Sequence, residues 1–440
     1  RAGTGKSMYC INDIKKRLQE VQDNKLIYIV PEQYTFQRET LLLREATESA
    51  LMRAQVISFK RMAYRVFEEC GGRAHDRLKE CGKNMLLYRV IQESNENLEY
   101  FNKIAKEQGF IEILSKTITE FKKYNVTPEL INSTLDELTE NNDPHLKQKM
   151  HDLSYIYNEF NKSIFNNSVD SDDELTILKE KLEKCTIYDN AIVWFDEFTT
   201  FTPQQLEIIR VLASKCQEVN ITLCMDELGK KKSDVTDVFN VISKTEQMIL
   251  NIMQEDNIKY LKPVDLNNNK NNRFKNSNEL SHLEKYFYAY PFEQYTRNIE
   301  NIRLYKANNI YDEMEAVAKE IIRLIQKEKY RYKDISVVCR NIENYDKVAA
   351  AVFTEYHIPY FLDKKIDLLN NPIVVLILSS LEIYLKKWSY ESVFKYLKSG
   401  LTNITIDEID VLENFVLANG VKNYKWTGDL SYISDDNKEI

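Results

Sequence analysis

The chain has 440 residues, with 60 lysines and arginines against 68 aspartates and glutamates, and this length predicts two to four domains instead of one core. Hydrophobic residues make up 43% of it, and 10 glycines and 8 prolines are too few for a collagen-like or broadly disordered protein. The net charge of −8 gives no overall attraction to phosphate backbones but is compatible with a local basic groove, and the longest apolar run, 373–378, is too short to span a membrane.

A phosphate-binding loop opens the chain. The run Gly3-Thr4-Gly5-Lys6-Ser7 matches the end of the pattern G-x-x-x-x-G-K-[ST], and the first glycine of that pattern would precede Arg1. Such a loop follows a β-strand that aims it at the phosphates, so we expect a strand and a glycine before Arg1. The other end, 435–440, carries no stop signal, and both ends therefore predict a longer parent protein.

The segments after this loop alternate between helix and strand. Apolar residues recur at helical spacing from 11 to 18, the run at 26–30 is typical of a buried strand, and a helix is predicted at 41–53. Further strands are predicted at 55–59, 191–195 and 220–224. This order is that of a parallel α/β sheet, so 1–60 and 186–265 are predicted to form one discontinuous core.

Between 61 and 185 the pattern turns helical. Apolar residues from 110 to 121 line one helix face, and glycine is nearly absent, which predicts an inserted helical subdomain. The neighbouring pair Lys122-Lys123 is expected to be a solvated surface charge.

A second core is predicted after a polar stretch. The Asn/Lys-rich segment 266–281 is typical of a flexible linker. Strand patterns then return at 302–305, 335–339 and 358–362. Helical patterns separate them, and Pro372 opens a further helix, as proline often does at a first helical position. We therefore expect 282–440 to be a second α/β core, truncated within the start of its own helical insertion.

The opening loop carries the sharpest chemical signal. Gly3 and Gly5 let backbone N–H groups converge on a polyphosphate, with Thr4 between them. Lys6 supplies a charge to the outer phosphates, Ser7 can ligate Mg²⁺, and the following helix adds its positive N-terminus. The alternative is a chance Gly/Lys turn. The helix and buried strand that follow favour an ATP site.

Two acids follow the strand predicted at 191–195. Asp196 would hold Mg²⁺ through water, and Glu197 would orient or deprotonate the attacking water. Alternatively, this acidic strand end caps the next helix. The pair and the loop support each other, because an ATP site needs both parts.

Several polar and aromatic residues follow other predicted strands and are candidates for DNA contact through phosphate binding and base stacking. They are Thr35, Phe36, Ser58, Phe59, Arg61 and Arg340. The alternatives are ordinary strand-to-helix connections and, for Arg340, a polar strand end.

The seven cysteines are widely spaced and include no CxxC pair. A disulfide framework or a zinc site is therefore not expected, and the reducing cytoplasm is the favoured compartment.

The ordered set of motifs resembles the AddB family, one of the two subunits of the bacterial ATP-dependent helicase/nuclease AddAB, related to UvrD and RecB. The resemblance rests on the loop at 1–7, the runs 29–33, 35–37 and 57–59, Phe195-Asp196-Glu197-Phe198 and 201–203, and the later runs 315–320, 338–341, 358–363, 397–401 and 412–415. It implies an α/β protein of superfamily 1 helicase-like architecture, with two RecA-like P-loop domains and helical insertions.

The resemblance also implies a function in double-strand break repair by homologous recombination. The family pairs with the AddA subunit, unwinds and resects double-stranded DNA, and scans one strand for Chi. Its nuclease domain holds a four-cysteine iron–sulfur cluster, which we expect only in a C-terminal part outside these 440 residues.

Two departures from helicase patterns leave ATP hydrolysis open. Met225-Asp226-Glu227-Leu228 stands where a Gly-Asp-x-x-Gln segment would be, and no Gln-x-Tyr-Arg-Ser segment supplies an arginine finger before 302. Glu197, by contrast, stands where the family often has glycine, as in an active ATPase. The alternatives are a catalytically complete superfamily 1 DNA translocase and a non-enzymatic scaffold for DNA and AddA.

Overall fold

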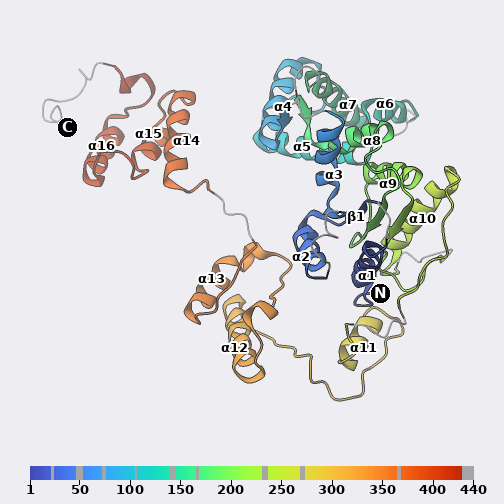
Figure 1. The fold of residues 1–440 in the computed structure, drawn as a ribbon. Helices are drawn as coiled ribbons and strands as arrows, with labels where there is room; N and C mark the ends of the chain where they lie inside the picture. Colours follow the sequence, from blue (N-terminus) through green and yellow to red (C-terminus); the bar gives the residue numbers. More distant parts are fainter. Residues whose placement is uncertain are drawn as a thin grey trace. The chain divides into compact units, whose positions relative to one another are not determined.

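The structure is a computed structural model that describes residues 1–20, 24–45, 53–71, 76–104, 107–137, 144–164, 168–229, 236–267, 273–363 and 368–428. The chain divides into two compact units, Arg1–Arg303 and Leu304–Ile440, and each is described by itself (Figure 1). The predicted linker at 266–281 belongs to the first unit, and its residues 268–272 lie outside the described ranges. The domain boundaries given above stay a prediction.

A parallel sheet with the strand order β2-β1-β5-β6 forms the centre of the first unit. Its strands are β1 (Leu26–Ile29), β2 (Ala54–Ile57), β5 (Ile192–Phe195) and β6 (Glu218–Ile221). The two central strands, β1 and β5, are buried at every position, as expected for a parallel sheet covered on both faces. The prediction of an α/β core with a parallel sheet is confirmed.

The two faces of this sheet follow from the alternation of side chains along its strands. Ile27 and Phe195 belong to one apolar cluster, and Tyr28 and Trp194 belong to another. The helices that contribute to the first cluster are α3 (Phe59–Glu69), α8 (Glu174–Lys184), α9 (Pro203–Lys215) and α10 (Asn240–Glu255). Those that contribute to the second are α1 (Lys6–Leu18) and α2 (Thr35–Glu45). Because β1 and β5 are in register, the residues that follow them emerge at one edge of the sheet.

Two predicted boundaries shift where caps and turns take over. The helix predicted at 41–53 begins at Thr35, after a short 3-10 helix η1 (Glu32–Tyr34), and residues 46–52 lie outside the described ranges. The strand predicted at 55–59 ends at Ile57, because the Ser58 side chain accepts a hydrogen bond from the Arg61 N–H and so caps α3.

The insertion between α3 and α8 has an apolar core of its own. Its helices are α4 (Glu80–Ser94), α5 (Gln108–Lys123), α6 (Pro128–Glu137) and α7 (Pro144–Ile164). A short parallel pair, β3 (Asp76–Leu78) with β4 (Ser168–Asp170), joins the segments before α4 and after α7. The insertion is thus helical apart from this pair (Figure 1).

The prediction that Lys122 is a solvated charge is wrong. Lys122 is 5% exposed, and its Nζ lies 2.8 Å from Asp170 and 2.7 Å from Asp173. Lys83, equally buried, pairs with Asp172 and lies 3.5 Å from Asp170. The insertion therefore contains a cluster of buried opposite charges, which is stable only when every member keeps its partners.

The second unit is helical in its described residues. Its helices are α12 (Ile310–Glu328), α13 (Asp346–Glu355), α14 (Pro372–Leu385), α15 (Tyr390–Leu397) and α16 (Ile406–Asn419). Pro372 opens α14 as predicted. The segments 302–305, 335–339 and 358–362, predicted as strands, form no ladder within the described ranges, and Leu304 and Phe361 are 98% and 90% exposed. Apolar sequence alone makes no strand, since a strand needs a hydrogen-bonded neighbour.

Across the described helices, no stretch combines the length and apolar character that crossing a bilayer requires.

Candidate nucleotide-binding site

The loop before α1 has the backbone shape that phosphate binding requires. Gly3 and Gly5 have φ angles of 72° and 90°, in the left-handed region where a side chain is disfavoured. Gly5 is the N-cap of α1, and no side chain in the described ranges caps the helix there. The first N–H groups of α1 are therefore left for an anion.

The lysine and threonine of the loop are held by its own backbone. Lys6 Nζ donates to the Arg1 carbonyl oxygen at 2.7 Å, and Thr4 Oγ1 donates to the same oxygen at 3.0 Å. The Arg273 N–H donates to the Gly3 carbonyl oxygen at 2.8 Å, so the end of the predicted linker contacts the loop. A bound phosphate would replace the Arg1 carbonyl as the acceptor for Lys6.

The loop meets the acids after β5. Ser7 Oγ donates to Glu197 Oε1 at 3.4 Å, and the guanidinium of Arg38, from α2, forms an ion pair with the same oxygen. Glu197 has a φ of 67°, which turns the chain sharply after the strand. The serine and the acidic pair are thus neighbours at one edge of the sheet.

Asp196 is held from the two neighbouring strands. Its carboxylate is 1% exposed and accepts hydrogen bonds from Tyr28 Oη at 2.6 Å and from Thr222 Oγ1 at 2.5 Å. Burial, together with the adjacent carboxylate, raises the pKa of Tyr28 well above its usual range, so the phenol stays a donor. The two donors fix the orientation of Asp196.

This donor set fits Mg²⁺ bound with a nucleotide. Among the described residues no group of three or more histidine, cysteine or acidic side chains forms a metal cage. Mg²⁺ commonly needs only one or two protein groups beside phosphate oxygens and water. The Ser7 hydroxyl and Asp196 supply such groups.

The alternative in which the acids cap the following helix is wrong. Thr202 caps α9: its side chain accepts from the Gln205 N–H, and the Gln205 side chain accepts from the Thr202 N–H. The acids are left for the nucleotide site.

The DNA-contact candidates differ in accessibility. Phe36 is 77% exposed, Arg61 is about half exposed and lies 3.8 Å from Glu39, and Arg340, in the second unit, is exposed. The remaining three are buried: Thr35 donates to the Glu32 carbonyl, Ser58 caps α3 and donates to the Glu32 side chain, and Phe59 packs on Phe195. DNA contact by any of the six stays a prediction.

Sequence reasoning missed Arg38, Tyr28 and Thr222. Tyr28 lies inside a buried strand and Thr222 just beyond a strand end, where neighbouring parallel strands bring polar groups together. Arg38 stands one turn into α2, and the earlier start of this helix brings it beside Glu197.

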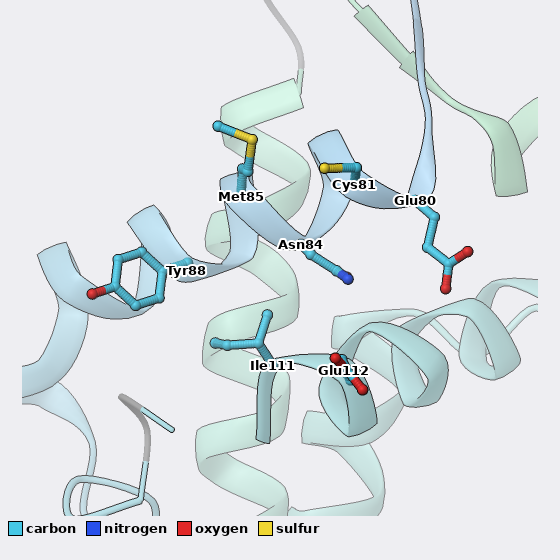
Figure 2. Close-up of a pocket in the computed structure, with 7 residues that line it drawn as sticks. All are labelled: Glu80, Cys81, Asn84, Met85, Tyr88, Ile111 and Glu112. Carbon is cyan, nitrogen blue, oxygen red and sulfur yellow. The ribbon is translucent and has the colours of Figure 1, made fainter. Parts of the chain in front are cut away.

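A separate hollow of about 670 Å³ lies in the insertion, between α4 and α5 (Figure 2). Met85, Tyr88 and Ile111 give it an apolar lining, with Glu80 and Glu112 beside them. These groups do not suit a phosphate, and the hollow plays no part in the nucleotide site.

Comparison with known families covers nearly the whole chain. The family described as ADDB, N-terminal, matches residues 1–284, and the UvrD-like helicase C-terminal domain matches residues 266–422.

Curated relatives are similar along the full chain. The AddB subunit of the ATP-dependent helicase/deoxyribonuclease of Clostridium perfringens strain 13 is 46% identical over 445 residues, covering 100% of this chain and 38% of the relative. The protein of the same name from Clostridium botulinum strain Loch Maree is 48% identical over 430 residues, covering 98% and 37%. The chain therefore spans less than two-fifths of the length of these relatives. On the family match and these identities, the chain belongs to the AddB family.

Proposed function

We propose that this chain is the nucleotide-binding, helicase-like part of the AddB subunit of an ATP-dependent helicase/deoxyribonuclease. The contact between Ser7 and Glu197, beside the buried Asp196, is the observation that carries the proposal, because it unites loop and acids at one sheet edge. In this proposal the chain has the superfamily 1 architecture with two RecA-like cores.

Each residue has a distinct proposed role. The N–H groups of the loop, Gly3 to Ser7, surround the phosphates of ATP, and Lys6 exchanges the Arg1 carbonyl for outer phosphate oxygens. Ser7 and Asp196 hold Mg²⁺, which neutralises phosphate charge when bound. Glu197 orients water, although its pairing with Arg38 favours binding over hydrolysis.

DNA and a partner subunit enter through the family. The relatives' name, a subunit of a helicase/deoxyribonuclease, supports double- and single-stranded DNA as ligands and AddA as the partner. We assign the complex to double-strand break repair by homologous recombination in the cytoplasm, with Chi scanning. The nuclease and its iron–sulfur cluster are proposed for residues outside this chain.

The proposal is tested by titrating the full-length protein with a fluorescent ATP analogue and Mg²⁺. Lys6→Ala is expected to weaken binding at least about tenfold, because a charge-assisted contact contributes roughly 1.5–3 kcal/mol. Lys16→Ala, an exposed lysine of the same helix, is the matched control. Binding equal in both variants would refute the nucleotide site.

Steady-state ATP hydrolysis with single-stranded DNA separates the alternatives. Robust turnover that is lost in Lys6→Ala would identify a complete translocase. No nucleotide binding by the unaltered protein would identify a scaffold.

A further inference from the structure

Arg38 links the nucleotide site to α2 without belonging to the loop or to the acidic pair. Its guanidinium pairs with Glu197 Oε1, the oxygen that also accepts the Ser7 hydroxyl. The Arg38 and Glu197 side chains are only 19% and 21% exposed. A mostly shielded ion pair of this kind is sensitive to what happens at either end.

The pair has a second arrangement within reach. Only Nη2 and Oε1 are joined, whereas Arg38 Nε and Glu197 Oε2 are buried and find no hydrogen-bond partner among the described residues. A guanidinium and a carboxylate form a stronger bidentate pair when both edges meet. The Ser7 hydroxyl holds Oε1 in the present arrangement, so its departure frees Glu197 to turn fully onto Arg38.

Helix α2 connects this pair to the outside. Successive helical residues are about 100° apart, so Phe36 and Arg38 point about 200° apart around the helix. Phe36 is 77% exposed, and Arg38 reaches the nucleotide site. Glu39, on the exposed side, lies 3.8 Å from Arg61. One helix therefore carries both the candidate DNA-contacting groups and the cation of the site.

We infer that Arg38 is a positioning residue that makes DNA binding on α2 depend on the nucleotide. The inference rests on the proposed function, since it takes Mg²⁺–ATP as the ligand of Ser7 and single-stranded DNA as the ligand of Phe36. Mg²⁺–ATP draws the Ser7 hydroxyl away from Glu197, the carboxylate closes onto Arg38, and α2 is fixed. A pre-ordered helix binds DNA more tightly, because less freedom is lost on binding.

Linkage gives the size and the symmetry of the effect. A coupling between two sites is typically 5- to 150-fold, and each ligand changes the affinity of the other by the same factor. We expect a non-hydrolysable ATP analogue with Mg²⁺ to tighten binding of a single-stranded oligonucleotide by about tenfold.

The test measures fluorescence anisotropy of a labelled oligonucleotide with the full-length protein, with and without the ATP analogue. Arg38→Gln is expected to bring the ratio of the two Kd values to about one, with nucleotide binding alone and DNA binding alone changed less than about threefold. Arg38→Lys should restore part of the ratio, because it restores the charge without the fork. Arg44→Gln, an exposed arginine of the same helix, should keep the full ratio.

Glu197→Gln provides a second variant that removes the other half of the ion pair. It should lose the ratio as Arg38→Gln does, and the double variant should lose nothing more. A full ratio in either single variant would overturn the inference while leaving the proposed function intact. Failure of the unaltered protein to bind the nucleotide would overturn both.

Discussion

Replacing Lys122 by methionine is the sharpest test of the buried charge cluster in the insertion. The substitution keeps the length of the side chain but removes the partner of Asp173 and the nearer partner of Asp170, which is fully buried. Removal of one member of a buried pair costs about 3–5 kcal/mol, because the remaining charge stays desolvated. Lys83, 3.5 Å from Asp170, still compensates in part, so we expect about 3 kcal/mol.

Hydrogen exchange measures this cost where it arises. In the full-length protein, a loss of about 3 kcal/mol should speed exchange of protected amides in α5 and β4 roughly 100-fold. Lys123→Met is the matched control, because the neighbouring lysine is exposed. Equal exchange in the two variants would refute the reasoning that Lys122 compensates a buried charge.

Two further predictions concern stability. Thr202→Ala should destabilise α9 by about 1 kcal/mol through loss of its cap, measured as a lower urea midpoint than that of the exposed control Thr200→Ala; unchanged midpoints would contradict the role of the cap. Burial raises the pKa of Tyr157 to about 12. The folded chain therefore keeps a proton that the unfolded chain loses near pH 10, so this contribution is complete below about pH 10 and is lost as the pH rises to about 12. Tyr157→Phe should make the alkaline fall of the urea midpoint shallower, and parallel curves would count against this assignment.

The sheet of the first unit is predictable because its strands are continuous apolar runs. The runs at 26–30 and 191–195 contain β1 and β5 nearly residue for residue. Buried lysines are harder to predict, since the partners of Lys122 lie 48 and 51 residues away in the sequence. The strands expected after residue 302 fail for a related reason: a ladder depends on neighbours that a local pattern does not contain.

The candidate site follows the same division. One rule, that parallel strands end at the same edge of a sheet, predicts that the loop and the acidic pair lie together, and Ser7 does contact Glu197. The hydrogen bonds from Tyr28 and Thr222 to Asp196, and the approach of Arg38, depend on side-chain directions from three neighbouring segments. Sequence spacing carries no record of such directions.

The left-handed backbone of Glu197 bears on how this position changes over evolutionary time. At a φ of 67° a non-glycine residue costs about 1–2 kcal/mol relative to a relaxed backbone, and glycine adopts the angle freely. Glutamate and glycine codons differ by a single nucleotide. One point mutation can therefore delete the carboxylate while relaxing the turn, so a lineage released from selection for hydrolysis would drift towards glycine with its sheet intact.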